Sequence, residues 1–310
     1  MVATGSQTPQ DGRRGRFTRR NGATAVGRIV GATVVGAALI GLLSGCSINQ
    51  AFAFGWPQGG VTPQSHRMFN LWIGSVIAAL AVGVFVWGLI FWCVVRYRRR
   101  RGDVELPVQT RFNLPIELIY TVAPVLIISV LFYYTAIIQT DVNRISQNPD
   151  VTVNVDAFKW NWKFSYPSTM GPDGQPVYTI GTDTYIPILV LPTNKTILFN
   201  EHSADVIHSF WVPEMLFKRD VFPGNVRNQF QTTILEEGAY VGRCAELCGT
   251  YHSMMNFEVR AVSADKYSQF LAAKSAGKTT GEALAGIGED PLAVTTKPFP
   301  NKRTADSTST

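Results

Sequence analysis

The chain has few charged residues and few cysteines and histidines. Only 16% of its 310 residues are charged, 46% are hydrophobic, and there are four Cys and four His. This composition excludes an intrinsically disordered chain, which needs high charge and few apolar residues. Four cysteines are also too few for a disulfide-stabilised scaffold. The sequence has no internal repeat, and its length fits about two domains.

The excess of positive over negative charge lies mostly at the start of the chain. Residues 1–45 hold six Arg against one Asp, whereas the remaining residues hold 22 basic and 21 acidic side chains. The net charge of +6 therefore comes mostly from the first 45 residues. Because the rest of the chain is nearly neutral, no nucleic-acid partner is expected.

The first 45 residues have the pattern of a signal peptide. An Arg-rich segment at 13–28 is followed by small apolar residues from Ile29 to Leu43 and by small residues before Cys46. A basic region, a short apolar region and a small-residue cleavage site predict removal of residues 1–45. Leu43-Ser44-Gly45-Cys46 resembles a bacterial lipobox, which implies a lipidated Cys46. The alternative is an ordinary signal peptide with an incidental cysteine.

Two long uncharged segments follow. Between Arg67 and Arg96 lie 28 residues without Asp, Glu, Lys or Arg, and between Glu117 and Asp141 lie 23 more. About 20 apolar residues cross a bilayer as a helix, so residues 67–141 are predicted to form a transmembrane hairpin. Buried core helices are the alternative. Neither segment contains His, so the hairpin offers no imidazole to a haem.

The loop between these segments sets the orientation. Residues 96–116 contain six Arg against one Asp and one Glu. The positive-inside rule places this loop in the cytoplasm. Residues 46–66 and everything after Asp141 are then predicted to lie on the outer side of the membrane.

Residues 142–262 are predicted to form an all-β outer domain. Short β-rich runs separated by Gly, Pro and Asn favour a sandwich or barrel. The expected strands are 151–155, 176–180, 186–191, 196–200, 207–212, 228–235, 239–243 and 257–262. The polar residues 263–310 are expected to form a short helix at 264–273 and then a mostly flexible C-terminal tail.

One cluster of residues has the chemistry of a metal site. Cys244 and Cys248 are followed by His252 and Met255, and His208 precedes them. Thiolates, imidazoles and a thioether suit copper, whereas carboxylates would be expected for calcium or magnesium. A mononuclear blue-copper site uses one Cys, so the second thiolate permits two bridging sulfurs and two metal ions.

Two simpler interpretations of this cluster remain open. The cysteines could form a disulfide bond, or two Cys and two His could hold a structural zinc ion. Neither interpretation accounts for Met255, because zinc seldom binds a thioether and a disulfide needs no histidine.

The pattern Cys244-x-Glu246-x-Cys248-x-x-x-His252-x-x-Met255, with His208 upstream and a two-span hairpin before it, resembles subunit II of haem–copper cytochrome c oxidases in a bacterial lipoprotein form. The resemblance covers residues from about 60 to 262. It implies a cupredoxin-like Greek-key outer domain and a binuclear copper centre, CuA. In that centre both Cys bridge two coppers, each His binds one copper, Met255 is a weak ligand and Glu246 contributes its backbone carbonyl.

The resemblance implies three further roles. The Glu246 side chain matches a ligand of a magnesium ion shared with subunit I, with a supporting carboxylate as the alternative. Trp160, in the aromatic run 158–166, matches the residue at which electrons arrive from cytochrome c, although such runs are more often core packing. Glu117 matches the entrance of a proton-uptake channel, unless it is only a solvated charge.

The implied function is that of the electron-accepting subunit of a terminal oxidase. Electrons pass from a soluble or membrane-held c-type cytochrome to the haem of subunit I, where oxygen is reduced to water and protons are translocated. The expected partners are subunit I, the other oxidase subunits and the lipid bilayer, in a bacterial cell membrane. Residues 141–262 hold nine basic and thirteen acidic residues, a net charge of −4 that permits docking of a basic cytochrome.

Other functions fit the sequence less well. A quinol oxidase subunit of this type lacks the copper ligands, and nitrous oxide reductase shares CuA but has no two-span anchor. A copper-binding assembly or storage lipoprotein is the alternative function. His66 and His202 match no ligand and are predicted to be surface residues.

Overall fold

The computed structural model describes residues 31, 53–54, 56–57, 59–98, 109–226 and 228–298. The chain divides into two compact units, residues 1–51 and 52–310, and nearly all described residues belong to the second unit. The predicted signal peptide, apart from Gly31, and the predicted lipidation site Cys46 lie outside the described residues. So does the central part of the basic loop, residues 99–108.

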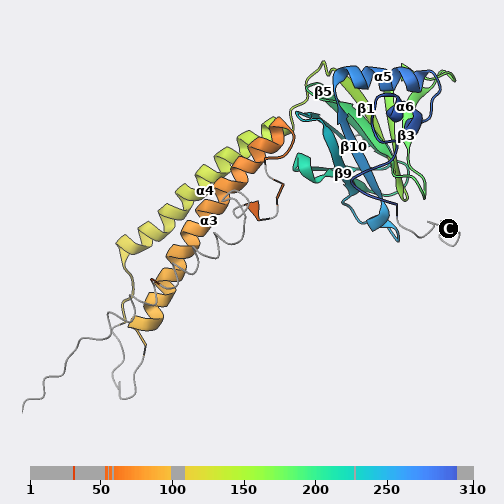
Figure 1. The fold of residues 1–310 in the computed structure, drawn as a ribbon. Coiled ribbons are helices and arrows are strands. Elements are labelled where there is room, and N and C mark those ends of the chain that lie inside the picture. Colours follow the sequence, from red (N-terminus) through yellow and green to blue (C-terminus); the bar gives the residue numbers. More distant parts are fainter. Residues whose placement is uncertain are drawn as a thin grey trace, which may run out of the picture. The chain divides into compact units, whose positions relative to one another are not determined.

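Two helices lie side by side before the β domain (Figure 1). They are α3 (Pro63–Arg96, 34 residues) and α4 (Leu114–Val142, 29 residues), and both are long and apolar enough to cross a membrane. Helix α3 begins at a capping box, in which Thr62 and Ser65 bond each other's backbone N–H groups. An Arg67–Asp141 ion pair joins the first turns of α3 to the last turn of α4.

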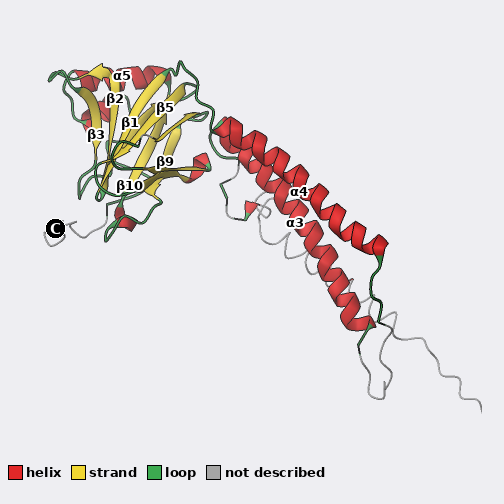
Figure 2. Cartoon of the chain, turned by 180° about the vertical axis from the view of Figure 1, so that it is seen from behind, coloured by secondary structure: helices red, strands yellow, loops and turns green. Residues whose placement is uncertain are grey.

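The β domain consists of two five-stranded sheets packed face to face (Figure 2). One sheet has the order β3-β2-β1-β5-β8 and the other the order β4-β10-β9-β6-β7. The strands are β1 Val151–Phe158, β2 Asn161–Met170, β3 Pro176–Ile180, β4 Ile188–Pro192, β5 Thr196–Ser203, β6 His208–Val212, β7 Phe217–Val221, β8 Asn228–Thr233, β9 Gly238–Cys244 and β10 Asn256–Val262. Parallel pairs β1–β5 and β4–β10 occur beside antiparallel ones. This mixed pairing connects strands that are far apart in the sequence. The two packed sheets confirm the predicted all-β outer domain.

Aromatic side chains fill the space between the sheets. Trp162, Phe164, Phe199, Phe210 and Phe257 are buried, and their rings pack mainly edge to face. Such packing adds to the free energy gained by removing these large side chains from water. The predicted aromatic run therefore contributes alternate residues of β2 to the core.

Two strands are absent from the sequence prediction. Strand β2 has the sequence NWKFSYPSTM, in which a proline interrupts the alternation, and β7 has the sequence FKRDV, in which three charged residues follow one another. Each pairs with a neighbour that does have a clear pattern, β1 and β6 respectively. Tertiary pairing therefore decides these two segments more than local sequence does.

The prediction of a mostly flexible tail after residue 273 is wrong for residues 274–298. Helix α5 (Ala264–Ser275) is followed by a second helix, α6 (Thr280–Gly286), with a capping box between Thr279 and Glu282. Helix α5 lies across one end of the strands (Figures 1 and 2). Tyr267 and Phe270 of α5 are buried in the hydrophobic core. Residues 274–298 are ordered because Ala283, Leu284 and Ile287 are buried in the same core.

A buried ion pair fixes the segment after α6 to β10. Glu258 is fully buried and accepts hydrogen bonds from the backbone N–H groups of Val294 and Thr295. Its other oxygen accepts from Arg260, which also contacts Glu289. Because each charged group has several partners, the burial of this network is compensated.

Candidate metal centre

The predicted ligands lie at the ends of strands and in the connecting loop of the β domain. His208 begins β6, Cys244 ends β9, and Cys248 lies in the loop that follows. His252 begins a short 3-10 helix, η2 (His252–Met254), and Met255 immediately precedes β10. The structure therefore brings together all five predicted metal-binding side chains, although His208 is 36 residues from Cys244 in the sequence.

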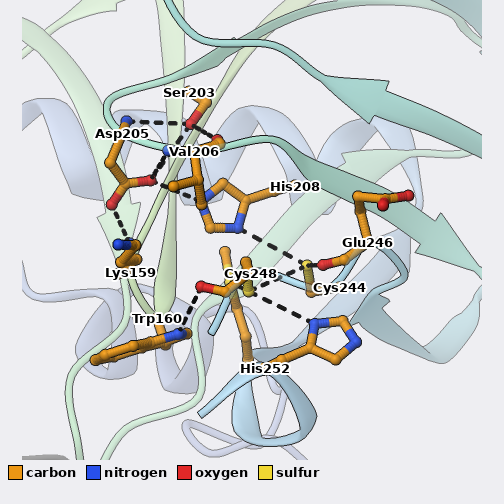
Figure 3. Close-up of polar contacts among 11 residues, drawn as sticks. Lys159, Trp160, Ser203, Asp205, Val206, His208, Cys244, Glu246, Cys248 and His252 are labelled. Carbon is orange, nitrogen blue, oxygen red and sulfur yellow. Dashed lines mark hydrogen bonds and ion pairs between the residues drawn. The ribbon is translucent and has the colours of Figure 1, made fainter. Parts of the chain in front are cut away.

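The two cysteine sulfurs form the middle of the cluster (Figure 3). Their Sγ atoms are 3.8 Å apart, which is much longer than the roughly 2 Å of a disulfide bond. The Nδ1 atom of His208 lies 3.8 Å from Cys244 Sγ, and the Nδ1 atom of His252 lies 3.5 Å from Cys248 Sγ. Each thiol therefore has its own imidazole.

Two weaker donors complete the set. The Sδ atom of Met255 lies 3.8 Å from Cys248 Sγ, and the carbonyl oxygen of Glu246 lies 3.3 Å from Cys244 Sγ. Met255 is fully buried, so its thioether faces the cluster and not solvent.

This donor set fits copper. Two soft sulfurs side by side, each with an imidazole nitrogen, match the preferences of copper for thiolate and imidazole ligands. Ligand atoms of His208, Cys244 and Cys248 all lie within 4.8 Å of one another, whereas His252 is outside that group among the described residues. A single tetrahedral zinc ion would need both imidazoles close to one point, so this geometry favours copper over a Cys₂His₂ zinc site.

The thiol pair readily loses one proton. A hydrogen bond from Cys248 lowers the pKa of Cys244 well below the usual thiol range, although burial opposes this, and a contact with His208 adds to the lowering. The same hydrogen bond, together with burial, raises the pKa of Cys248. One thiolate is therefore available to a metal ion at neutral pH, and metal binding releases the second proton.

His208 also contacts a carboxylate that the sequence analysis did not assign. Its Nε2 atom lies 2.8 Å from Oδ1 of Asp205, and its ring is fully buried. Burial opposes protonation of His208, but hydrogen bonds to Cys244 and Asp205 raise its pKa above the usual value. The only signal in the sequence is a spacing of three residues between Asp205 and His208.

Trp160 lies directly against the ligand loop. Its indole Nε1 donates a hydrogen bond to the carbonyl oxygen of Cys248 at 3.1 Å, and its ring packs edge to face on Tyr251 at 4.9 Å. The ring is partly exposed, whereas Trp162 is fully buried and donates to the Met255 carbonyl at 3.3 Å. The two tryptophans thus support the same loop from the surface and from the core.

Glu246 presents its two ends in different directions. The carbonyl faces the sulfur pair, while the carboxylate points away from it (Figure 3). The side chain is 44% exposed, and its nearest charged partner is Lys218 Nζ at 3.8 Å. The carboxylate is therefore accessible at the surface of the described chain.

The remaining sequence-predicted residues lie away from the cluster. Glu117 is in the first turn of α4, where its Oε1 accepts a hydrogen bond from the N–H group of Asn113 at 2.9 Å. The side chain therefore caps a helix. His66 and His202 are exposed, as predicted. Cys93 is also exposed, on α3.

Comparison with known proteins gives consistent matches along the chain. Residues 151–262 match the family model described as cytochrome C oxidase subunit II, periplasmic domain, and residues 51–136 match the transmembrane domain of the same subunit. A probable cytochrome c oxidase subunit 2 of Nocardia farcinica is 47% identical, covering 96% of this chain and 92% of that protein. Cytochrome c oxidase subunit 2 of Mycobacterium tuberculosis is 45% identical, covering 86% of this chain and 88% of that protein.

A solved structure is also similar. The periplasmic domain of subunit II of cytochrome oxidase from Bradyrhizobium japonicum is 25% identical, covers 42% of this chain and 96% of that chain, and gives a TM-score of 0.37. The family models cover both the apolar helices and the β domain, and the relatives extend over nearly the whole length. The chain therefore belongs to the cytochrome c oxidase subunit II family and is a membrane-anchored subunit of an oxidoreductase complex with a C-terminal periplasmic domain.

Proposed function

We propose that this chain is the electron-accepting subunit of a terminal cytochrome c oxidase. It receives electrons from a c-type cytochrome at a binuclear copper centre and passes them to the haem of subunit I, where oxygen is reduced to water and protons are translocated. One observation carries this proposal: two cysteine sulfurs 3.8 Å apart, each beside its own imidazole nitrogen.

The proposed centre holds two copper ions. Cys244 and Cys248 would bridge the pair, His208 and His252 would each bind one ion, and Met255 with the Glu246 carbonyl would complete the set. When bound, the copper pair supplies reversible one-electron redox chemistry. Because the thiolates are negative and soft, they are the residues that favour copper over harder cations.

The barrel keeps these side chains in place. His208 and Met255 are fully buried, and the two cysteines are nearly so. The backbone N–H of Cys244 donates to the Met255 carbonyl at 3.0 Å, and that of Ala245 donates to the Ser209 carbonyl at 3.0 Å. A site supported by strands and hydrogen bonds changes little in geometry, and a small change in geometry favours fast one-electron transfer.

Trp160 is the proposed contact for the electron donor. Its ring is partly exposed, and its indole N–H is bonded to the carbonyl of a residue that also provides a bridging sulfur. This connection gives a short path of covalent and hydrogen bonds from the surface to Cys248 Sγ. A donor that places its haem edge over Trp160 would use this path.

Three further roles are proposed on the family pattern. The exposed Glu246 carboxylate would bind a magnesium ion together with subunit I, since carboxylate oxygens are preferred magnesium ligands. Glu117, in the first turn of α4, would collect protons from the cytoplasmic water for subunit I. Cys46 would carry a lipid after removal of residues 1–45, in a bacterial cell membrane.

Reduction of the copper-loaded protein by a c-type cytochrome tests this function. The full chain in detergent is loaded with copper and mixed with a reduced, soluble, basic c-type cytochrome in a stopped-flow instrument. We expect oxidation of the haem and bleaching of the copper absorption with the same time course. Replacement of Trp160 with Ala should slow both changes about tenfold or more while leaving the oxidised spectrum intact.

The same samples distinguish the alternative function of copper storage or delivery. A storage protein must release its metal, so a strong copper chelator or an acceptor protein would remove copper within minutes. The proposed centre retains copper during many cycles of oxidation and reduction. Rapid loss of copper without electron transfer from the cytochrome would contradict the proposal.

A further inference from the structure

Asp205 lies between the turn that carries the proposed electron-accepting tryptophan, Trp160, and the proposed copper ligand His208. Its carboxylate forms hydrogen bonds with this turn and with His208 (Figure 3). Its Oδ2 accepts a hydrogen bond at 2.7 Å from the N–H of Lys159, the residue before Trp160. Its Oδ1 lies 2.8 Å from Nε2 of His208 and also accepts from the N–H of Val206 at 2.7 Å. Both carboxylate oxygens are therefore engaged.

The contact with His208 fixes the chemistry of the imidazole. A carboxylate only accepts hydrogen bonds, so the ring nitrogen that faces Asp205 carries the proton. In the neutral ring the other nitrogen, Nδ1, which lies 3.8 Å from Cys244 Sγ, then carries the lone pair that could bind a copper ion. Because the ring is fully buried, it has little freedom to rotate away from this orientation.

The contact with Lys159 fixes the turn that carries Trp160. This bond joins segments 46 residues apart in the sequence, the turn between β1 and β2 and the loop before β6. On the far side of that turn, the Trp160 indole is bonded to the Cys248 carbonyl. The contacts link six residues in a closed ring: Asp205, Lys159, Trp160, Cys248, Cys244 and His208.

We propose that Asp205 is a positioning residue for electron transfer. Its carboxylate holds His208 in the form protonated on Nε2 and also holds the turn of Trp160, so that the indole stays on the carbonyl of Cys248. This role rests on the proposed function of the centre. The competing view is that Asp205 is only a surface charge that attracts a basic donor, since its side chain is 29% exposed.

Asp156 provides a matched control. It lies on β1, is 37% exposed, and pairs at 3.7 Å with His202, which is exposed and, among the described residues, belongs to no potential metal cluster. Asp156→Asn removes one negative charge from the same domain. Asp205→Asn removes the same charge, and it also replaces one acceptor oxygen with an NH₂ donor, so it cannot accept hydrogen bonds from both Lys159 and a His208 ring protonated on Nε2. Asp205→Glu keeps the charge but displaces the carboxylate by one methylene.

The first measurement uses the copper-free full chain in detergent. Hydrogen exchange followed by mass spectrometry reports the protection of the Lys159 amide. We expect exchange about tenfold faster in Asp205→Asn, and no change in Asp156→Asn. This readout needs neither copper nor a donor, so it isolates the positioning of the Trp160 turn.

The second measurement uses the copper-loaded chain and a reduced, basic c-type cytochrome at about 0.5 M salt, where attraction between surface charges is largely screened. Loss of a partner of a metal ligand typically costs 10–100-fold in affinity or activity. We expect Asp205→Asn and Asp205→Glu to shift the copper absorption bands and to slow reduction about tenfold. Asp156→Asn should match the wild type in both properties.

The proposal is overturned if Asp205→Asn and Asp156→Asn behave alike in exchange, spectrum and rate. It is equally overturned if Asp205→Glu is indistinguishable from the wild type, because charge alone would then be sufficient. Failure of the proposed function differs from both results: the wild-type chain itself would bind no copper pair or would accept no electron from the cytochrome.

Discussion

The two halves of the proposed metal centre are built differently. His208 and Cys244 lie on neighbouring strands, β6 and β9, and His208 is completely buried beside Asp205. His252 and Cys248 lie in the loop between β9 and β10, where His252 is partly exposed on a short 3-10 helix close to Trp160. In the proposed function, the strand-held half would provide rigidity and the loop-held half would provide access for electrons.

The largest expected effect is loss of the centre when either bridging thiolate is removed. Cys244→Ser and Cys248→Ser each replace a soft sulfur with a hydroxyl, which is a poor bridging ligand for copper. We expect both variants to lose the electron paramagnetic resonance signal of one electron shared by two copper nuclei. Survival of that signal in either variant would show that the assignment of the bridging residue is wrong.

The two histidines should differ in their effect on the copper-free fold. His208→Ala leaves a cavity and removes the imidazole partner of Asp205, so we expect a loss of about 2–4 kcal/mol in the free energy of unfolding. His252→Ala, at a partly exposed position, should cost less than about 1 kcal/mol. Denaturant unfolding of the full chain without copper measures both values, and equal losses would contradict the division between a rigid and an accessible half.

The two tryptophans should also differ: the buried Trp162 should matter more for stability, and the partly exposed Trp160 more for the rate of reduction. Trp162→Phe removes a buried hydrogen bond to Met255 and part of a packed ring, at a cost of about 2 kcal/mol. Trp160→Phe should cost less than about 1 kcal/mol in stability but should slow reduction by a cytochrome. Unfolding curves and stopped-flow rates on the same two variants decide this, and a slow but fully stable Trp162→Phe protein would reverse the assignment.

A smaller effect is expected at Glu201 on β5. Its carboxylate is buried, and neither oxygen has a hydrogen bond from the described residues. Burial raises the pKa of Glu201 well above its ordinary value of 4.5, although Arg219 opposes this. The folded chain thus binds this proton more tightly than the unfolded chain does, so stability falls as the pH rises above about 4.5.

Glu201→Gln should remove the loss of stability that occurs above about pH 4.5. It should therefore raise the free energy of unfolding at pH 7 by about 1 kcal/mol or more. Below pH 4 the variant and the wild type should have nearly equal stability, because both side chains are then neutral. Unfolding midpoints measured from pH 4 to pH 8 check this difference. A variant that is less stable than the wild type at pH 7 would mean that the carboxylate makes a favourable ion pair with Arg219.

Features that depend on local pattern could be predicted from the sequence. Uncharged length identifies both helices, and strand β3 was predicted with its observed bounds, Pro176–Ile180. The proposed metal ligands could be selected because thiolate, imidazole and thioether donors at these spacings suit copper. The structure then places His208 beside Cys244 by pairing β6 with β9.

Features that depend on contacts between distant segments could not be predicted. Strand β7 is charged and forms only because β6 pairs with it, and α6 is ordered by burial of Ala283 and Leu284. Asp205 has an ordinary sequence context, and its proposed role depends on a hydrogen bond from Lys159, 46 residues away. Local sequence describes each segment by itself, whereas these features depend on contacts between segments that only the fold brings together.

The most direct test of this account is the metal content and spin state of the full chain after loading with copper. The chain in detergent is reduced, incubated with copper, freed of excess metal and analysed by elemental analysis and electron paramagnetic resonance. The account predicts two copper ions per chain and a spectrum in which one unpaired electron interacts equally with two copper nuclei. One metal ion per chain, or a spectrum from a single copper nucleus, would contradict it.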